Sequence, residues 1–158
     1  MSIEQARAHL ARFGADGRIV ELDQSSATVE KAAAALGVEP ARIAKTIAVQ
    51  TKAGPAVIVD AGDARINNRA FKDFFGEKLR MIPGEKTESL VGHPPGGVCP
   101  FGVAEGVRIY LDESLRRFET VYPACGSQNS AIGLSPAELE EFTSPDGWVD
   151  LSTPLNRT

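Results

Sequence analysis

The segment 92–102, which reads GHPPGGVCPFG, concentrates several groups that could do chemistry. Gly96 and Gly97 tolerate positive φ and let a ligand approach the main chain, so N–H groups there could bind a phosphate or an oxyanion. An ordinary tight turn would explain the same two glycines. The chain has no G-x-x-x-x-G-K-[ST] or G-x-G-x-x-G motif after a predicted strand, so the pattern predicts neither a P-loop nor a dinucleotide site.

Cys99 and His93 could act as a nucleophile and its base, because a thiol attacks a carbonyl as the thiolate. Two prolines separate them, however, and Pro100 leaves no helix N-terminus beside the thiol. We therefore interpret Cys99 as a small buried apolar residue, and we expect no chemistry of Cys125. His93 is expected at a loop surface or pocket rim. It could shape the pocket, form hydrogen bonds or act in acid–base catalysis, and its role stays open.

Lys45 is the third candidate, and it lies in the predicted strand ARIAKTIAVQT. Strand alternation places it on the bulkier apolar face, together with Ile43, Ile47 and Val49, and hence on the core side. From such a face a lysine can extend its ammonium group to water. It can also project into a cleft and hold a phosphate as a point charge. The position alone leaves both interpretations open.

Three segments resemble, in order and spacing, the YbaK/prolyl-tRNA synthetase-associated editing domain family of freestanding aminoacyl-tRNA deacylases. They are RIAKTIAV, GHPPGGVCPFG and RIYLDESLRRFETVYPACGSQNSAIGLSPAEL, and the resemblance covers residues 27–151. It implies that Lys45 engages the 3′-terminal nucleotide of tRNA, and that Lys45 and Gly97 are the catalytic residues. It also implies a set of substrate-binding residues: His93, Gly96, Val98, Cys99, Pro100, Gly126, Ser127 and Asn129.

The sequence departs from the family pattern at two of these positions. Cys99 stands where relatives often have serine, which weakens the hypothesis of a thiol nucleophile. His93 replaces a tyrosine of some relatives, so their amino-acid specificity does not carry over to this chain.

The reaction that the resemblance implies is hydrolysis of the ester in mischarged tRNA, with a small amino acid such as Ala, Ser, Cys or Thr. Such an ester is already activated, so a positioned water and stabilisation of the oxyanion suffice. The resemblance implies that a ribose hydroxyl of the terminal adenosine helps to activate that water. Two other functions stay open, a hydrolase that depends on Cys99 and a non-catalytic tRNA-binding module.

Length and composition fit one globular domain over residues 1–158, with 42% hydrophobic and 24% charged residues. The net charge of −4 argues against a broad surface for duplex DNA, and no apolar run is long enough to cross a membrane. The N-terminal segment predicts an amphipathic helix and no signal peptide, so we expect a cytoplasmic protein. Two cysteines and two histidines lack zinc-ligand spacing, so neither a metal nor a cofactor is expected.

The expected partners are the 3′ end of aminoacyl-tRNA and an aminoacyl-tRNA synthetase. Basic residues could form a modest patch for the tRNA end beside the cleft, although three of them would equally fit a solvated helix face. The patch would consist of Arg42, Lys45, Arg65, Arg69 and Lys72.

Helix and strand signals alternate irregularly, which predicts an α+β fold with a curved, barrel-like mixed sheet flanked by helices. Thr28, Asn67 and Ser135 are expected to cap helices, and Gly37 and Gly76 to end two of them. We expect strands at 18–23, 41–51, 56–62, 108–112, 119–126 and 130–134. In this fold Lys45, Gly97 and Gly126 should face one cleft.

Overall fold

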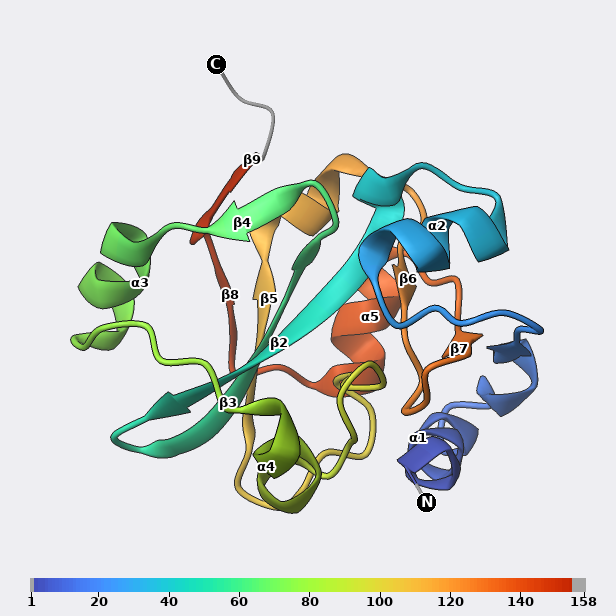
Figure 1. Cartoon of the computed structure of the whole chain (residues 1–158), viewed down its shortest axis with the longest axis horizontal. Coiled ribbons are helices and arrows are strands. Elements are labelled where there is room, and N and C mark those ends of the chain that lie inside the picture. The colour runs from blue at the N-terminus through green and yellow to red at the C-terminus, as the bar shows by residue number, and fades with distance from the viewer. Residues whose placement is uncertain (1, 155–158) are drawn as a thin grey trace.

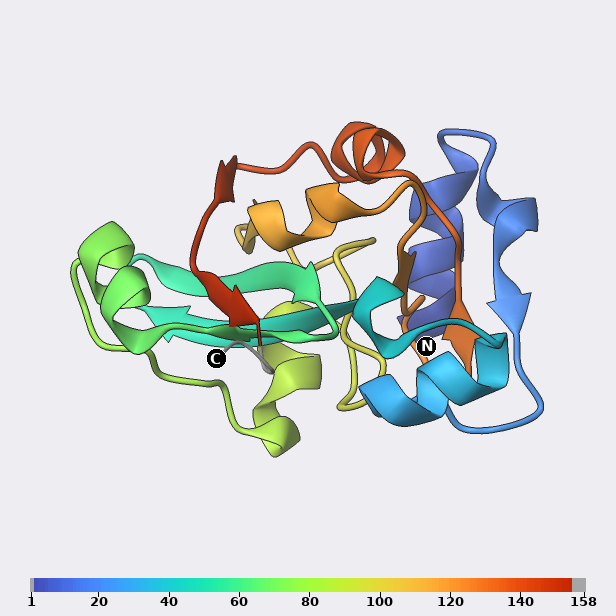
Figure 2. The same cartoon turned by 90° about the horizontal axis from the view of Figure 1, so that it is seen from above.

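The computed structural model describes residues 2–154, which form a five-stranded mixed sheet, two small sheets and the helices around them (Figures 1 and 2). β2 and β3 form an antiparallel hairpin, whereas the pairs β2–β6, β3–β5 and β5–β8 are parallel. The strand order is β6 (Tyr122–Pro123), β2 (Ile43–Thr51), β3 (Gly54–Ala61), β5 (Arg108–Asp112) and β8 (Gly147–Val149). This arrangement confirms the predicted α+β fold with a mixed sheet.

The other elements surround this sheet, with α3 at one end of the molecule and α1 at the other in both views (Figures 1 and 2). The small sheets are β1 (Val20–Glu21) with β7 (Ser130–Ala131), and β4 (Ala64–Ile66) with β9 (Ser152–Pro154). The α-helices are α1 (Ser2–Ala11), α2 (Val29–Leu36), α3 (Asn68–Phe75), α4 (Gly84–Val91) and α5 (Pro136–Thr143). Short 3-10 helices are η1 (Asp16–Arg18), η2 (Pro40–Arg42) and η3 (Glu113–Arg117).

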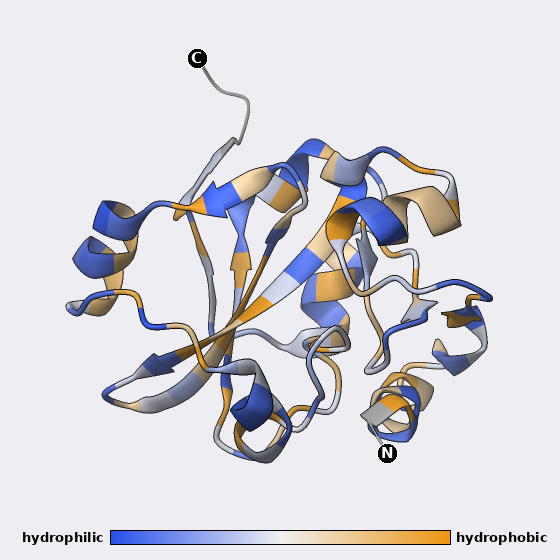
Figure 3. Ribbon diagram, viewed as in Figure 1, coloured by the Kyte–Doolittle hydropathy of each residue, from blue (hydrophilic) through white to orange (hydrophobic). Residues whose placement is uncertain are grey.

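Strand alternation divides the buried residues between the two faces of the sheet, and Figure 3 shows apolar residues along the central strands. Ala44, Ala48 and Val57 belong to the larger core, which includes residues of α1, α4 and α5. The opposite face carries a smaller core in which Ile58 packs with Phe71 of α3. Lys45 alternates onto that second face, which it shares with Ile47 and Val49 as the alternation predicted. The core on that side is the smaller of these two.

Most helix boundaries follow the local signals in the sequence. The Thr28 side chain accepts a hydrogen bond from the Lys31 N–H at the start of α2, and Gly37 ends the helix at φ 71°. Asn67 caps α3 in the same way. Ser135 and Glu138 form the reciprocal bonds of a capping box at the start of α5.

Three predicted strands are much shorter in the structure than in the prediction. The segments 18–23, 119–126 and 130–134 contribute only the two-residue strands β1, β6 and β7. The pattern also gave no signal for β4, α4, β8 or β9. These pieces are short, and tertiary contacts rather than local propensity decide their conformation.

Candidate active site

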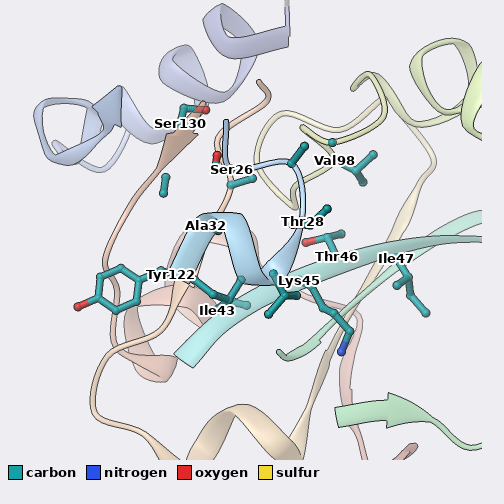
Figure 4. A pocket seen from close by; sticks show the side chains of 16 residues that line it. Ser26, Thr28, Ala32, Ile43, Lys45, Thr46, Ile47, Val98, Tyr122 and Ser130 are labelled. Carbon is teal, nitrogen blue, oxygen red and sulfur yellow. The ribbon is translucent and has the colours of Figure 1, made fainter. Parts of the chain in front are cut away.

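A pocket of about 270 Å³, here called the β2-edge pocket, opens where β2 loses its neighbouring strand (Figure 4). β6 pairs with β2 only at Ile43 and Ala44. Farther along, the segment before α4 covers the same edge, because the Ile82 N–H donates to the Ala48 carbonyl at 2.9 Å. By strand alternation the peptide groups of Thr46 point to this edge as well. They lie between the two covered stretches and face the pocket.

Three other segments wall the β2-edge pocket. The start of α2, the glycine-rich loop (residues 92–102) and the β6–β7 region all line it. Their side chains are mostly small or apolar, and they include Ala27, Val29, Ala32, Val98, Tyr122 and Ala131. The volume lies below the range of about 300–1,000 Å³ that is typical of sites for drug-sized ligands. The pocket therefore suits a small group.

The Lys45 ammonium group is held by three acceptors at the rim of this pocket. Nζ donates to the carbonyls of Ala61 at 2.7 Å and Ala64 at 2.5 Å, and lies 3.0 Å from Oδ2 of Asp60. Three acceptors match its three N–H donors. The side chain is 27% exposed, and Figure 4 shows it directed away from Val98. Lys45 thus lines the pocket with its stem and holds its charge at the outer side.

Asp60 is a buried carboxylate that the sequence analysis missed. It is the register partner of Lys45 in β3 and is fully buried. Burial raises the pKa of Asp60 to about 6, although Lys45 acts in the opposite direction. The Ser152 hydroxyl donates to Oδ2 at 3.2 Å, while Oδ1 has no partner among the residues described. The available signal was an acidic residue inside the otherwise apolar strand AVIVDAG.

The glycine-rich loop packs its backbone directly against the CGSQN segment. A Cβ on Gly97 would lie 2.7 Å from both the Gly126 carbonyl carbon and the Ser127 nitrogen. The Gly97 N–H donates to Pro94 at 3.0 Å. Lys45 lines the β2-edge pocket, but Gly97 and Gly126 do not appear among its lining residues, so they lie behind its wall. The amide of Gly97 is therefore not the oxyanion donor that the sequence suggested.

Two neighbouring amides replace Gly97 as candidate donors. Gly96 and Val98 both line the β2-edge pocket. Within the described part of the chain, the N–H groups of these two residues donate to no protein acceptor. Gly96 has a φ of 81°, which its lack of a side chain permits. The loop therefore carries two N–H groups without a protein partner at residues that line the pocket.

His93 and Cys99 lie in the core and not at the pocket rim. Both are fully buried, and the structure overturns the expected surface position of His93. They do approach each other, with Nε2 and Sγ 3.5 Å apart, despite the intervening prolines. Burial raises the pKa of the Cys99 thiol to about 12 and lowers the pKa of His93. This pair, like the buried Pro100, lines neither pocket around Lys45, so it offers no accessible thiolate.

The polar residues of the CGSQN segment hold loops together instead of lining the pocket. The Ser127 hydroxyl donates to Oγ of the buried Ser130 at 2.7 Å. The Asn129 amide donates to the Leu22 carbonyl at 3.1 Å. Ser130 itself lines the β2-edge pocket. Ser127 and Asn129 therefore support the wall from behind.

Thr46 is a second polar residue that the sequence analysis passed over. It lines the β2-edge pocket, and its Oγ1 is buried without a hydrogen-bond partner among the described residues. An unsatisfied buried hydroxyl costs free energy, so a ligand that supplied a partner for Oγ1 would gain that free energy on binding. Its position directly after Lys45 was visible in the sequence, but the open strand edge was not.

Within residues 2–154, no group of three or more His, Cys, Asp or Glu side chains is arranged to hold a metal ion. No helix in that part of the chain has the length and apolar character needed to span a bilayer.

Comparison with known proteins places this geometry in a family. Residues 23–142 match the model of the aminoacyl-tRNA editing domain. The uncharacterized protein YwhH of Bacillus subtilis (strain 168) is 45% identical over 152 residues, which is 96% of this chain and 97% of YwhH. The proline–tRNA ligase of Limosilactobacillus fermentum is 33% identical over 136 residues. That match covers 82% of this chain but only 21% of the ligase.

Solved structures agree with the sequence matches. A crystal structure described as a candidate trans-editing enzyme for prolyl-tRNA synthetase superposes with a TM-score of 0.86 at 28% identity. The alignment covers 96% of this chain and 97% of that one. The hypothetical protein APE2540 gives a TM-score of 0.78 at 30% identity over 90% of this chain and 99% of that one. The chain belongs to the aminoacyl-tRNA editing domain family.

Proposed function

We propose that this protein hydrolyses the ester bond of mischarged aminoacyl-tRNA that carries a small amino acid, such as Ala, Ser, Cys or Thr. The observation that supports this most is the β2-edge pocket of about 270 Å³, with free N–H groups on one wall and Lys45 at its rim. A small amino acid fits such a volume. The ligand of the protein would be the 3′ end of aminoacyl-tRNA. An aminoacyl-tRNA synthetase stays a predicted partner.

The proposed mechanism uses no protein nucleophile. The N–H groups of Gly96 and Val98 would stabilise the oxyanion that forms when water attacks the ester carbon. Thr46 Oγ1 would accept a hydrogen bond from the amino group of the substrate. A ribose hydroxyl of the terminal nucleotide would orient the water. Lys45, whose three N–H donors are already bonded within the protein, would attract the phosphate of the nucleotide to the rim by its charge. When the tetrahedral intermediate collapses, the bond between the acyl carbon and the ribose oxygen breaks. The ribose oxygen takes one proton of the attacking water and leaves as a hydroxyl, the amino acid leaves as its carboxylate, and the second proton passes to solvent.

Selection among amino acids would then depend on pocket size. An apolar pocket discriminates by about 1–3 kcal/mol for each methylene. Larger amino acids would be excluded by the limited volume of the pocket, while small ones would be separated only weakly. The expected activity therefore covers several small amino acids and not one alone.

The test is single-turnover deacylation of a panel of tRNAs charged with Ala, Ser, Cys, Thr, Pro, Val and Leu. We expect hydrolysis of one or more of the four small esters, at rates well above the spontaneous reaction, and little hydrolysis of the Leu ester. Tight binding of charged tRNA without turnover would indicate the non-catalytic module instead. Hydrolysis that is abolished by Cys99→Ala would indicate the thiol-dependent enzyme.

A further inference from the structure

A second and larger pocket adjoins the β2-edge pocket. It has a volume of about 790 Å³ and is here called the β4–α3 pocket, because β4 and the start of α3 form much of its wall. Lys45 and Ile47 line both pockets, so the two hollows meet at these side chains. The Lys45 ammonium group bonds to Ala64 of β4, which is itself part of the second pocket. The charge of Lys45 thus lies where the two pockets join.

The β4–α3 pocket is more basic than the molecule as a whole. Arg65 and Arg69 line it, and Lys72 and Lys78 line a smaller hollow that shares Arg69 with it. Among the residues described, these four cations form no ion pair. This concentration contrasts with the net charge of −4. The surface therefore attracts an anionic ligand although the protein is acidic.

Arg42, by contrast, does not belong to this surface. It pairs with Glu39 and stacks over the ring of Phe118, and it lines neither pocket. Arg42 therefore does not line the pocket that Lys45, Arg65 and Arg69 share. The other four members lie close to one another. Lys45, Arg65 and Arg69 line the β4–α3 pocket, and Lys72 lines the neighbouring hollow, which shares Arg69 with that pocket.

The same pocket also offers apolar and amide groups. Met81 is 53% exposed, and it lines the pocket together with Leu79. Asn67 and Asn68 also line the pocket, and Oδ1 of Asn67 accepts the Ala70 N–H that caps α3. Proteins hold single-stranded nucleic acid through a basic groove for the backbone and apolar or aromatic surfaces for the bases, and amides read base edges. The β4–α3 pocket combines all three kinds of group.

We propose that the β4–α3 pocket binds the unpaired nucleotides directly 5′ of the aminoacylated one. Arg65 and Arg69 contact their phosphates, and Leu79 and Met81 support a base. This inference rests on the proposed function, which puts the aminoacyl group in the β2-edge pocket and the terminal nucleotide at Lys45. A strand that leaves Lys45 enters the neighbouring basic hollow, whose volume is in the range of nucleotide-sized ligands.

The first test measures binding without catalysis. Calorimetric titrations would use AMP and the single-stranded RNAs CA, CCA and ACCA, all uncharged. We expect the affinity of the wild type to rise at least about fivefold from AMP to CCA, since CCA adds phosphates for Arg65 and Arg69 and bases that can pack on Leu79 and Met81. The double variant Arg65→Gln/Arg69→Gln should lose most of this rise, and its salt slope should fall by about 0.7 for each phosphate that is no longer bound.

The matched control is the double variant Arg12→Gln/Lys52→Gln. It removes the same charge from two exposed side chains that line neither pocket, so it should bind CCA like the wild type. Met81→Ser should reduce the gain from AMP to CCA and leave the salt slope unchanged. Thermal melts would confirm that all variants are folded, as expected for exposed positions.

The second test separates this inference from the proposed function. With an aminoacyl-tRNA that the wild type deacylates, Arg65→Gln/Arg69→Gln should raise KM about tenfold or more with little change in kcat, because uniform binding is lost. Deacylation with an unchanged KM and unchanged CCA affinity in this variant would overturn the inference and leave the proposed function intact. If Arg65→Gln/Arg69→Gln selectively loses CCA binding but the wild type deacylates no tRNA, the proposed function is overturned and the binding site for the unpaired nucleotides is supported. AMP or inorganic triphosphate that binds as tightly as CCA would also overturn it.

Discussion

Lys45 and Asp60 face each other across the β2–β3 hairpin, and their side chains meet with Nζ 3.0 Å from Oδ2. The carboxylate is fully buried, whereas the lysine keeps 27% of its side chain exposed. A buried carboxylate beside a partly solvated ammonium group costs desolvation that the pair only partly offsets. The pair is therefore better explained as a device that fixes Lys45 than as a source of stability.

The first prediction concerns the pH dependence of folding. The net pKa of Asp60 is about 6, against 3.8 for an ordinary aspartate. Burial is the largest cause of the rise and Asp112 adds to it, whereas Lys45 opposes it. The folded protein binds the Asp60 proton more tightly than the unfolded chain does. The Asp60 contribution to stability is therefore full below about pH 4 and is lost as the pH rises through about 6.

Denaturant unfolding of the wild type and Asp60→Asn between pH 4 and 7 checks this prediction. The free energy of unfolding of the wild type should fall relative to that of Asp60→Asn as the pH rises. In Lys45→Met the fall should begin at the same pH but extend to higher pH and become larger, because the group that lowers the folded-state pKa of Asp60 is gone. A wild type that gains stability relative to Asp60→Asn over this interval would contradict the assignment.

The second prediction compares Lys45→Ala with Cys99→Ala. Loss of Lys45 should slow deacylation by roughly 100-fold, since a misplacement of about 1 Å can cost that much. Cys99 is buried in the core with a protonated thiol, so its loss should leave most activity and cost about 1 kcal/mol of stability. Single-turnover rates on an aminoacyl-tRNA that the wild type deacylates measure the two activities, and urea unfolding measures the change in stability.

The opposite result has a clear meaning. Cys99 lies 3.5 Å from His93, so a hidden nucleophile–base pair would need only access to substrate. If activity disappears with Cys99 and survives without Lys45, while thermal melts show both variants folded, the thiol is the nucleophile. The proposed backbone-driven mechanism would then be wrong.

Local signals predicted much of the fold because they are short-range. The caps at Thr28, Asn67 and Ser135 and the β2–β3 hairpin all depend on neighbouring residues. The short strands β4, β8 and β9 depend on partners far along the chain, and no local pattern marks them. Local physics therefore sets the long elements, and tertiary packing sets the pieces that close the molecule.

The site was predicted in part for the same reason. Lys45, Gly96 and Val98 do line the β2-edge pocket. The sequence could not show that β6 leaves β2 after Ala44, which is what exposes the edge at Thr46. Nor could it show that Gly97 packs behind the wall. A glycine in a loop indicates either close ligand approach or close backbone packing, and only the three-dimensional structure separates the two.

The third prediction uses this close packing of Gly97. A methyl group in Gly97→Ala would meet backbone atoms of Gly126 and Ser127 at 2.7 Å, and neither can move without shifting its loop. We expect a loss of about 1–3 kcal/mol in the free energy of unfolding. Gly17→Ala is the control, since no atom lies within 4 Å of the added methyl, and it should change stability by less than about 0.5 kcal/mol. Equal stability of the two variants in urea unfolding would contradict the close contact.

The last prediction concerns the unpaired hydroxyl of Thr46. Thr46→Val keeps the shape of the side chain and removes an Oγ1 that is buried at the pocket without a partner among the residues described. The folded protein should lose no stability and should gain up to about 1 kcal/mol, because a desolvated hydroxyl is removed. If that hydroxyl accepts a hydrogen bond from the substrate amino group, single-turnover deacylation should slow by about tenfold or more, since a bond to a charged group contributes about 1.5–3 kcal/mol.

Thr46→Ser is the matched control, because it keeps the hydroxyl and should retain activity within a fewfold of the wild type. For the assignment to hold, Thr46→Val must keep or raise the free energy of unfolding and must lower the rate of deacylation. A Thr46→Val variant that is destabilised would show that the hydroxyl is satisfied inside the fold. A variant that is stable and fully active would show that the hydroxyl does not meet the substrate, and the amino group would then have to be held by the peptide carbonyl on the open edge of β2.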